Sequence, residues 1–231
     1  MSENARKYLL YAAGEVLLVV IGILIALQID TWNENRKLQQ RQAEMLTDLR
    51  SDLEETRKEL EFGMRFNTLT LENYRNLMKS IEDEAPYSAK IDSASRYLPM
   101  FHVPRFTRTT YESIKSQGLD LITNDELKRQ IAGLYENSFL YLIEDQAKVE
   151  WSLFNTTTLE VVNRYLKFMD NGDLMVYPVD FEAMKVDPSF VNFLAQLIVL
   201  RASGVRFYEG IIQEISTVVS AIDTELETLR K

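Results

Sequence analysis

Several residue types are scarce in this chain or missing from it. Cysteine is absent and histidine occurs once, as His102. Disulfides, thiol catalysis and metal sites built from cysteines or paired histidines are therefore excluded. Glycine occurs 8 times and proline 5 times in 231 residues. Because both residues mark turns, their scarcity disfavours an all-β domain and favours long helices.

Sequence motifs of catalysis are missing as well. The chain contains no H-E-x-x-H zinc motif, no G-x-S-x-G nucleophile motif and no glycine-rich phosphate loop. We therefore expect no enzyme activity, no catalytic or metal-binding residues and no cofactor. The net charge is −9, from 26 basic and 35 acidic residues, which disfavours a nucleic-acid partner because phosphate binding needs a clustered positive face.

One long apolar run lies near the N-terminus. Residues 8–29 read YLLYAAGEVLLVVIGILIALQI, and as a helix they span roughly 33 Å, the thickness of a bilayer core. We predict a transmembrane helix over residues 8–30, preceded by a short cytoplasmic tail, residues 1–7. A cleaved signal peptide is the alternative, but the run ends without an A-x-A-like site, which favours an uncleaved signal anchor.

Charges flanking the run bear on its orientation. Arg6 and Lys7 precede it and favour a cytoplasmic N-terminus under the positive-inside rule. Arg36, Lys37 and Arg41 follow it and favour the opposite orientation. Because the preceding tail is short, we expect it to stay inside and the C-terminal domain to lie outside the cytoplasm.

Glu15, Gly22 and Ala26 fall on one stripe of the predicted membrane helix, at about 100° per residue. Gly22 and Ala26 form a small-xxx-small pair that lets helices approach closely. In one interpretation, these three residues form a membrane-helix interface that carries a protonatable group. In the other, which we favour, Glu15 extends to the nearby membrane surface toward basic residues of the tail.

The remaining residues, 31–231, are predicted to form a soluble helical-bundle domain. We expect long helices over about residues 33–84, 123–170 and 188–230, and a short helix over about 110–117. The second long helix is predicted to be capped by Thr123 or Asn124 and to end at Asn171-Gly172, and the third to begin at Asp187-Pro188. The fold class is therefore all-α: one N-terminal transmembrane helix continues into an elongated bundle of long antiparallel helices.

Two of the long helices carry apolar residues at heptad spacing. The first seam consists of Leu46, Leu49, Leu53, Leu60, Tyr74, Leu77 and Ile81, and the second of Leu194, Leu197, Tyr208, Ile211, Ile215, Val218 and Ile222. Each seam suits packing either inside one bundle or against a second copy. We expect a homo-oligomer.

Polar or small residues interrupt both seams, namely Gly63 and Asn67 in the first and Arg201 in the second. On an up-down-up path, Gly63 and Asn67 lie about 45–50 Å from the membrane end of the domain, and Arg201 lies about 20 Å from it. We therefore expect these interruptions not to meet, which argues against a shared ligand pocket.

Residues 85–109 differ in character from the helices. Three prolines break the helical pattern, and Arg96, Arg105 and Arg108 alternate with aromatic residues. Such interleaving could bind an anionic ligand. We favour the alternative, a connector whose aromatic side chains cover the end of the bundle.

Two stretches resemble the signatures of a known family. The segment GEVLLVVIGILIALQIDTWNENRK, residues 14–37, resembles the N-terminal signature of uncharacterised membrane proteins from Bacteroidota. The segment TYESIKSQGLDLITNDELKRQIAGLYE, residues 110–136, resembles a second signature of the same family, which is defined by a domain of unknown function. The resemblance implies a bacterial membrane protein with a helical domain. Together with the one predicted span, this leads us to expect a single-pass inner-membrane protein whose C-terminal domain lies in the periplasm.

Two functions fit these expectations. The first is an oligomerising scaffold or sensor that couples to a membrane-protein partner through its membrane helix, because the predicted tail is too short to hold an output domain. The second is an accessory subunit of an ion-driven inner-membrane machine that uses Glu15 as its membrane carboxylate. The second rests on analogy with other single-span subunits.

Overall fold

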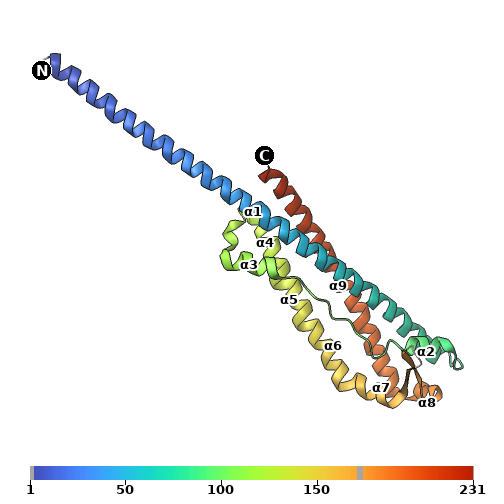
Figure 1. Cartoon of the computed structure of the whole chain (residues 1–231). Helices are drawn as coiled ribbons and strands as arrows, with labels where there is room; N and C mark the ends of the chain where they lie inside the picture. The colour runs from blue at the N-terminus through green and yellow to red at the C-terminus, as the bar shows by residue number, and fades with distance from the viewer. Residues whose placement is uncertain (1–2, 171–173, 231) are drawn as a thin grey trace.

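The computed structural model describes residues 3–170 and 174–230, and it confirms an all-α fold. Its principal feature is α1, a helix that runs unbroken from Glu3 to Glu82 (Figure 1). The apolar segment and the first bundle helix are thus one continuous rod, as the absence of a break between residues 30 and 33 predicts. From Gly14 to Arg41 the side chains of α1 are exposed, and its packed part begins at Gln42.

Chain order places short elements between the long helices. After α1 come α2 (Ala89–Ser95), α3 (Thr109–Gln117), the 3₁₀ turn η1 (Leu119–Leu121), α4 (Asp125–Gly133), α5 (Phe139–Tyr141), α6 (Ala147–Leu153), α7 (Leu159–Tyr165), the strands β1 (Leu166–Asp170) and β2 (Leu174–Pro178), α8 (Phe181–Val186) and α9 (Pro188–Leu229). Three π-helical stretches, η2 (Leu134–Ser138), η3 (Leu142–Gln146) and η4 (Phe154–Thr158), join α4 to α7 into one helical run.

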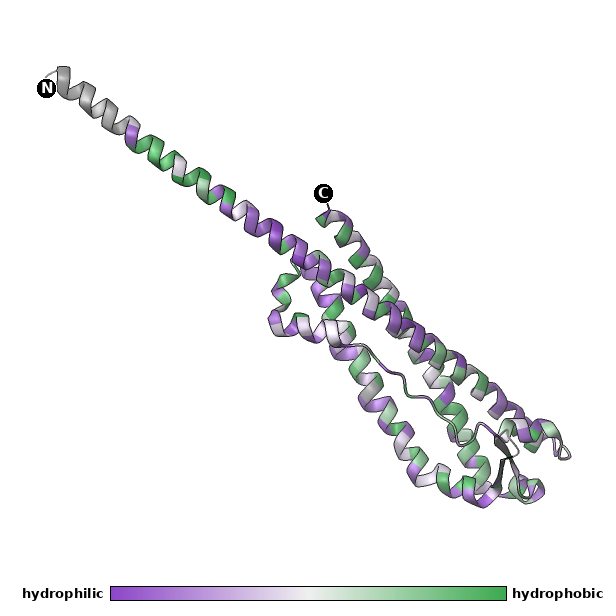
Figure 2. Cartoon of the chain, viewed as in Figure 1, coloured by the Kyte–Doolittle hydropathy of each residue, from purple (hydrophilic) through white to green (hydrophobic). Residues whose placement is uncertain are grey.

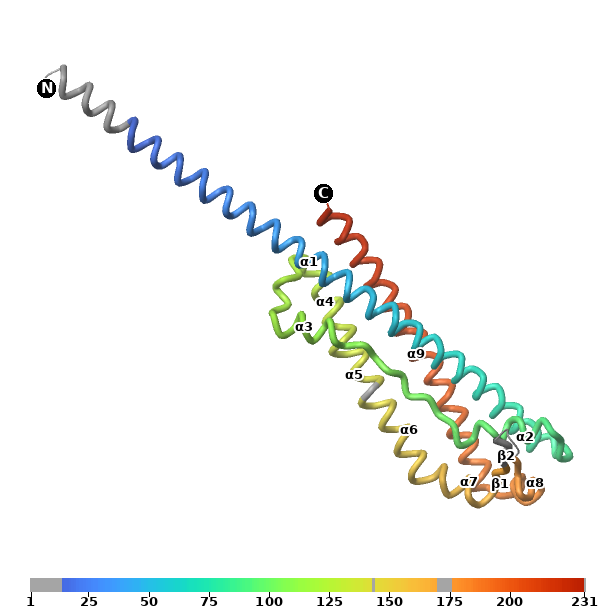
Figure 3. Tube along the Cα trace, in the orientation of Figure 1, coloured from blue at the N-terminus to red at the C-terminus, as the bar shows by residue number. Residues whose placement is uncertain are grey.

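The path of the chain differs from the expected up-down-up order. Residues 99–108, here called the strap, run back along α1 from its far end (Figure 3). The strap's Arg105 and Thr107 donate backbone N–H groups to Glu59 Oε1 and Thr56 Oγ1 of α1, each over 3.4 Å. The run α4–α7 therefore travels parallel to α1, and α9 returns antiparallel to it.

The strap also corrects the expected role of the aromatic residues in residues 85–109. They lie along the bundle instead of covering its end. Phe106 stacks on Phe139 of α5 with ring centroids 4.7 Å apart, and Phe101 meets Trp151 of α6 edge-on at 4.9 Å. These side chains fill the space between α1 and the α4–α7 run, where a fourth long helix is missing.

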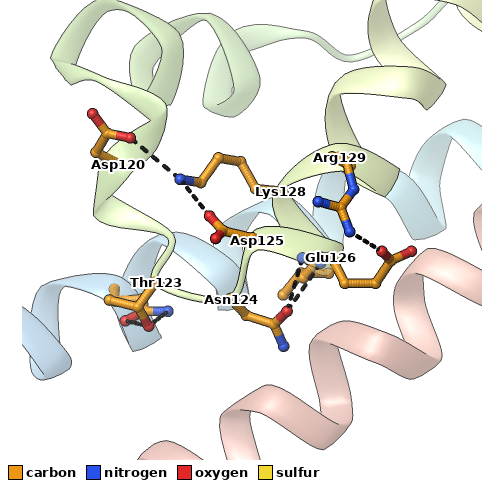
Figure 4. Close-up of polar contacts among 9 residues, drawn as sticks. Asp120, Thr123, Asn124, Asp125, Glu126, Lys128 and Arg129 are labelled. Carbon is orange, nitrogen blue, oxygen red and sulfur yellow. Dashed lines mark hydrogen bonds and ion pairs between the residues drawn. The ribbon is translucent and has the colours of Figure 1, made fainter.

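The start of α4 is fixed by the polar contacts that its sequence predicts (Figure 4). Asn124 is the N-cap, and its Oδ1 accepts from the backbone N–H groups of Glu126 and Leu127 at 3.1 Å. Thr123, the other cap candidate, instead bonds Gln42 of α1 over 3.3 Å. Asn124 also donates to Glu225 of α9 over 2.8 Å, so this corner ties three helices together.

The predicted helix over residues 123–170 is wrong at its C-terminal end. The helical run ends at Tyr165, and β1 pairs antiparallel with β2 from Leu166↔Pro178 to Asp170↔Leu174. The expected helix end at Asn171-Gly172 lies outside the described residues. Leu166 and Val176 are buried in the core at the far end of the bundle, whereas Phe168, which pairs with Val176, is exposed.

Buried apolar side chains form two core clusters. One, nearer the apolar end of α1, includes Leu46, Leu53, Tyr135, Ile215 and Ile222; the other, at the far end, includes Tyr74, Leu77, Tyr165, Phe190 and Leu197. Both heptad seams are used here, because α1 and α9 pack along each other within one chain.

Two helices are long and apolar enough to cross a membrane, α1 and α9. They differ in surroundings. The apolar segment of α1 that follows Gly14 projects clear of the bundle (Figure 2), and none of its described side chains is buried. In contrast, α9 contributes eleven buried apolar residues to the core, in addition to the buried Arg201.

Candidate functional site

A buried polar layer separates the two core clusters, and Arg201 of α9 is at its centre. Its side chain is 2% exposed. Among the residues whose burial the structure describes, no other charged residue is buried. The guanidinium forms a two-point ion pair with Glu150 of α6: Nη1 faces Oε1, and Nη2 donates to Oε2 over 3.0 Å. Burial alone would lower the pKa of Arg201, but the Glu150 carboxylate outweighs it and holds the pKa above its ordinary value.

The third helix of this layer is α1, through Asn67. Its Oδ1 lies 3.5 Å from Nη1 of Arg201. Gly204 lies close by on α9, and a Cβ there would come within 2.9 Å of Asn67 Nδ2. The expectation that the two polar interruptions do not meet is therefore wrong. Because α9 runs back from the far end of the bundle, Arg201 and Asn67 are each about 20 Å from that end.

Tyrosines complete the layer on both sides, Tyr74 in the far core cluster and Tyr208 in the cluster nearer the apolar end of α1. Tyr74 of α1 donates its hydroxyl to the carbonyl of Tyr97 over 2.8 Å, which anchors the chain segment that leads into the strap. Burial raises the pKa of Tyr74 to about 12, with the nearby Arg201 charge acting in the opposite sense. Burial likewise raises the pKa of Tyr208. Both phenols therefore stay neutral at physiological pH and serve as hydrogen-bonding groups.

His102 attaches the strap to this layer. Its ring packs edge-on against Phe62 at 5.1 Å and lies over Gly63, where a Cβ would come within 2.8 Å of the imidazole. Gly63 is thus the interruption that lets the strap approach α1. A cavity of about 20 Å³, near the size of one water molecule, is lined by His102, Asn67, Glu150 and other residues of the layer.

Two opposing effects act on the imidazole of His102. Burial lowers its pKa, and the Glu59 carboxylate, 3.4 Å from Nε2, raises it; burial is the larger effect. Although the pair is within ion-pair distance, Nε2 forms no hydrogen bond of good geometry among the described residues. We therefore take the neutral imidazole as the folded-state form.

This arrangement fixes how the helices pack against one another. A buried ion pair contributes little net stability over an apolar pair, but it penalises any packing that separates its partners. Here it locks α6 to α9, while Asn67 and His102 add α1 and the strap. Every long segment of the bundle thus meets at one layer, and none can slide without leaving a buried polar group unpaired.

The residues predicted as a membrane-helix interface remain together on α1. Glu15, Gly22 and Ala26 are all exposed, and a Cβ at Gly22 would meet no atom within 4 Å. The stripe is therefore open to another helix, and its use as an interface stays a prediction.

The three arginines proposed for an anionic ligand are spread along residues 96–108. Arg96 follows α2 as its C-cap, Arg105 lies within the strap, and Arg108 is the last residue of the strap and the N-cap of α3. Arg108 donates to Glu112 over 2.9 Å, so its charge is already paired. Binding of an anion by these residues stays a prediction.

Sequence reasoning missed Glu150 as a site residue. It is one of many acidic residues on a helix, and its pattern does not distinguish it from a solvated one. Arg201 offered a signal, because a cation within an apolar heptad seam needs a buried counter-charge. The chain path was needed to identify which carboxylate supplies it.

Comparison with known families identifies the family of this chain. The model described as "Family of unknown function (DUF6090)" matches residues 15–203, well over half of the sequence, so the chain belongs to this family. The match covers the apolar segment of α1, the strap, the α4–α7 run and the polar layer up to Ser203, and so includes Asn67, Glu150 and Arg201. Comparison with the curated proteins gives no match, and comparison with the solved structures gives none.

Removing one partner of the buried pair should be far more damaging than removing both. We expect Arg201→Met alone, or Glu150→Leu alone, to lower the free energy of unfolding by about 3–5 kcal/mol, because each leaves a buried charge unpaired. The double variant should regain much of that loss. Urea denaturation of the full chain in mild detergent measures the cycle.

The matched control is the Arg50–Asp223 ion pair, which joins α1 to α9 at the surface over 2.7 Å. Both side chains are more than 40% exposed, so its single variants should have much smaller effects. Additive losses at Arg201 and Glu150 would show that the pair is not coupled in solution.

His102 should make the fold less stable as the pH falls. Because its folded-state pKa is lowered below the unfolded value of 6.5, the unfolded chain binds the proton more readily, and stability is lost on acidification below that value. The free energy of unfolding should drop more for the wild type than for His102→Gln between about pH 7 and about pH 5. Subtracting the two curves removes the carboxylate contribution. Parallel curves would contradict the assignment.

Proposed function

We propose that the protein is a single-pass, membrane-anchored scaffold or sensor that self-associates and couples its bundle to a membrane-protein partner through α1. The observation that carries the proposal is the continuity of α1 over 80 residues, from Glu3 to Glu82. Its first part is bare and apolar, and its last part forms the core with α9. A change in the packing of the bundle therefore moves the membrane segment as a rigid extension.

The difference between the two apolar helices supports a single span. Burial of the core side chains of α9, including Phe190, Leu194 and Ile215, is worth roughly 1.5–3 kcal/mol per large side chain. Insertion of α9 into lipid would give up this packing and would place the Arg201 charge in hydrocarbon. For α1, in contrast, no part of the chain that the structure describes covers the segment that follows Gly14.

Arg6 and Lys7, which precede the apolar segment, support the placement of the bundle outside the cytoplasm, as a periplasmic domain of a bacterial inner-membrane protein. Arg36, Lys37 and Arg41, on the other side of the segment, act in the opposite sense. A signal in the bundle would then reach the membrane partner through rotation or displacement of α1. The stripe of Gly22 and Ala26 is the surface through which membrane helices meet.

A helical insertion tests whether the bundle sets the face that the membrane helix presents. Two alanines inserted after Leu38, where α1 is exposed, turn the apolar segment by about 200° relative to the bundle. In the otherwise cysteine-free chain, cysteines at Gly22 and Ala26 should cross-link between copies in native membranes. With the insertion, cross-linking should move to Leu24 and Gln28, two residues further on.

The matched control is an insertion of seven alanines at the same point, close to two full turns, which should restore cross-linking at Gly22 and Ala26. If cross-linking stays at Gly22 and Ala26 with two alanines inserted, the bundle does not control the membrane helix. If no position in the segment cross-links in the wild type, self-association through this helix is wrong.

A further inference from the structure

An open apolar groove lies between α9 and the α4–α7 run, away from the strap. One section, of about 600 Å³, is lined by Val149 and Leu153 of α6 and by Val199, Leu200 and Phe207 of α9, among others. Val149 is 49% exposed and Val199 is 67% exposed. Branched side chains at such exposure, adjacent along one groove, form a surface that burial would stabilise.

The groove continues along α9 toward the C-terminus. A second section of about 340 Å³ shares Phe207 with the first and is also lined by Tyr141 and Gly210. A third, of about 370 Å³, shares Asn137, Ser138 and Glu214 with the second and reaches Val218. From Asn192 to Val218 the groove follows α9 for about 39 Å, the length of a long helix.

We infer that the occupant of this groove is α9 of a second copy of the chain, in a parallel dimer whose two-fold axis runs along the helices. The inference deepens the proposed function by naming the self-association surface, and it rests on that function for the membrane anchor. In this arrangement each α9 lies in the groove of the other copy, so that both grooves are filled at once.

The height of the groove selects this occupant. Arg201 and Gly204, beside the groove, face Asn67 of α1. Asn67 is 37 residues beyond Asp30, or about 55 Å along an unbroken helix. A lipid chain does not reach this height from the bilayer surface. A second copy anchored in the same membrane presents its own α9 at the same height and in the same direction.

The size and shape of the surface also fit a dimer. A strip about 39 Å long and two helix diameters wide covers roughly 800 Å² on each copy, which is the size of a standard specific interface. On α9 the outward positions include Ala195, Ser203 and Gly210, and these small residues allow two α9 helices to approach closely.

The test uses the full chain in lipid nanodiscs, with mass measured across a dilution series. Val199→Glu places a carboxylate in the lining of the groove and leaves the core of the monomer unchanged. It should weaken the dimer roughly tenfold or more. Val186→Glu is the matched control, because Val186 is 78% exposed on α8 and lies outside the groove. Circular dichroism verifies that both variants keep their helices.

Cross-linking gives a second, independent readout. Ser203→Cys, the single thiol of its chain, should be joined to the same residue of the other copy by a short bismaleimide. Thr68→Cys, on the exposed face of α1, should not react in this way. A link between identical residues on α9 is the signature of a two-fold axis parallel to that helix.

The outcomes separate this inference from the proposed function. If the wild type is a dimer that Val199→Glu does not weaken, and Ser203→Cys forms no link, the groove is not the dimer interface. Self-association would then use another surface. A wild-type monomer at every concentration, with no link at Ala26→Cys, overturns both. If the wild type is a monomer that co-purifies with a different chain, and Val199→Glu loses that chain, the groove binds that chain. This result overturns the second copy as the occupant.

Discussion

A guanidinium buried in the middle of a helical bundle requires a carboxylate beside it, and much of this structure follows from that requirement. Arg201 obtains its carboxylate from Glu150, and Asn67 approaches the same nitrogen from α1. Separation of the ion pair would leave a charge in an apolar core, at a cost of several kcal/mol. The polar layer therefore fixes the register of three long segments. The two apolar clusters on either side of it supply most of the hydrophobic burial but little register specificity.

Fixing the register matters because α1 extends far beyond the bundle. A helix of 80 residues is about 120 Å long, so a small change in how its packed half meets α9 becomes a larger displacement at its bare end. The strap adds to this restraint. It occupies the place of a fourth helix with hydrogen bonds to α1 and aromatic contacts to α5 and α6. This leaves the opposite side of α9 uncovered, which is where the groove lies.

Helices were the most predictable part of this fold. The heptad positions of α1 and α9 are buried as expected, except for the partly buried Ile81. The Asp187-Pro188 start of α9 is capped by Asp187, and Asn124 caps α4. Local signals are sufficient for these features because capping and amphipathicity act within a few residues. The hairpin after Tyr165 was missed because Asn171-Gly172 was interpreted as a helix end, although the same dipeptide is also typical of a turn between strands.

The chain path, and with it the candidate site, could not be predicted from local signals. Whether residues 85–109 cover one end of the bundle or return along it depends on contacts far apart in sequence, such as Phe106 with Phe139. That choice reverses the direction of both later helices. It decides whether Arg201 meets Asn67, and it brings Glu150 rather than another carboxylate to Arg201.

The central claim is that the membrane segment and the bundle are joined by one rigid helix, and a distance across the junction tests it most directly. Because the chain has no cysteine, spin labels on cysteines at Ala26 and Lys58, both exposed positions of α1, report on this segment alone when the labelled chain is diluted with an excess of unlabelled, cysteine-free chain, so that a dimer holds at most one labelled copy. Pulsed electron–electron double resonance on the full chain in nanodiscs should give a single narrow distribution of label-to-label distances near 48 Å, the length of 32 helical residues. A broad distribution, or one centred at a clearly shorter distance, would show that α1 bends or breaks between the apolar segment and the bundle.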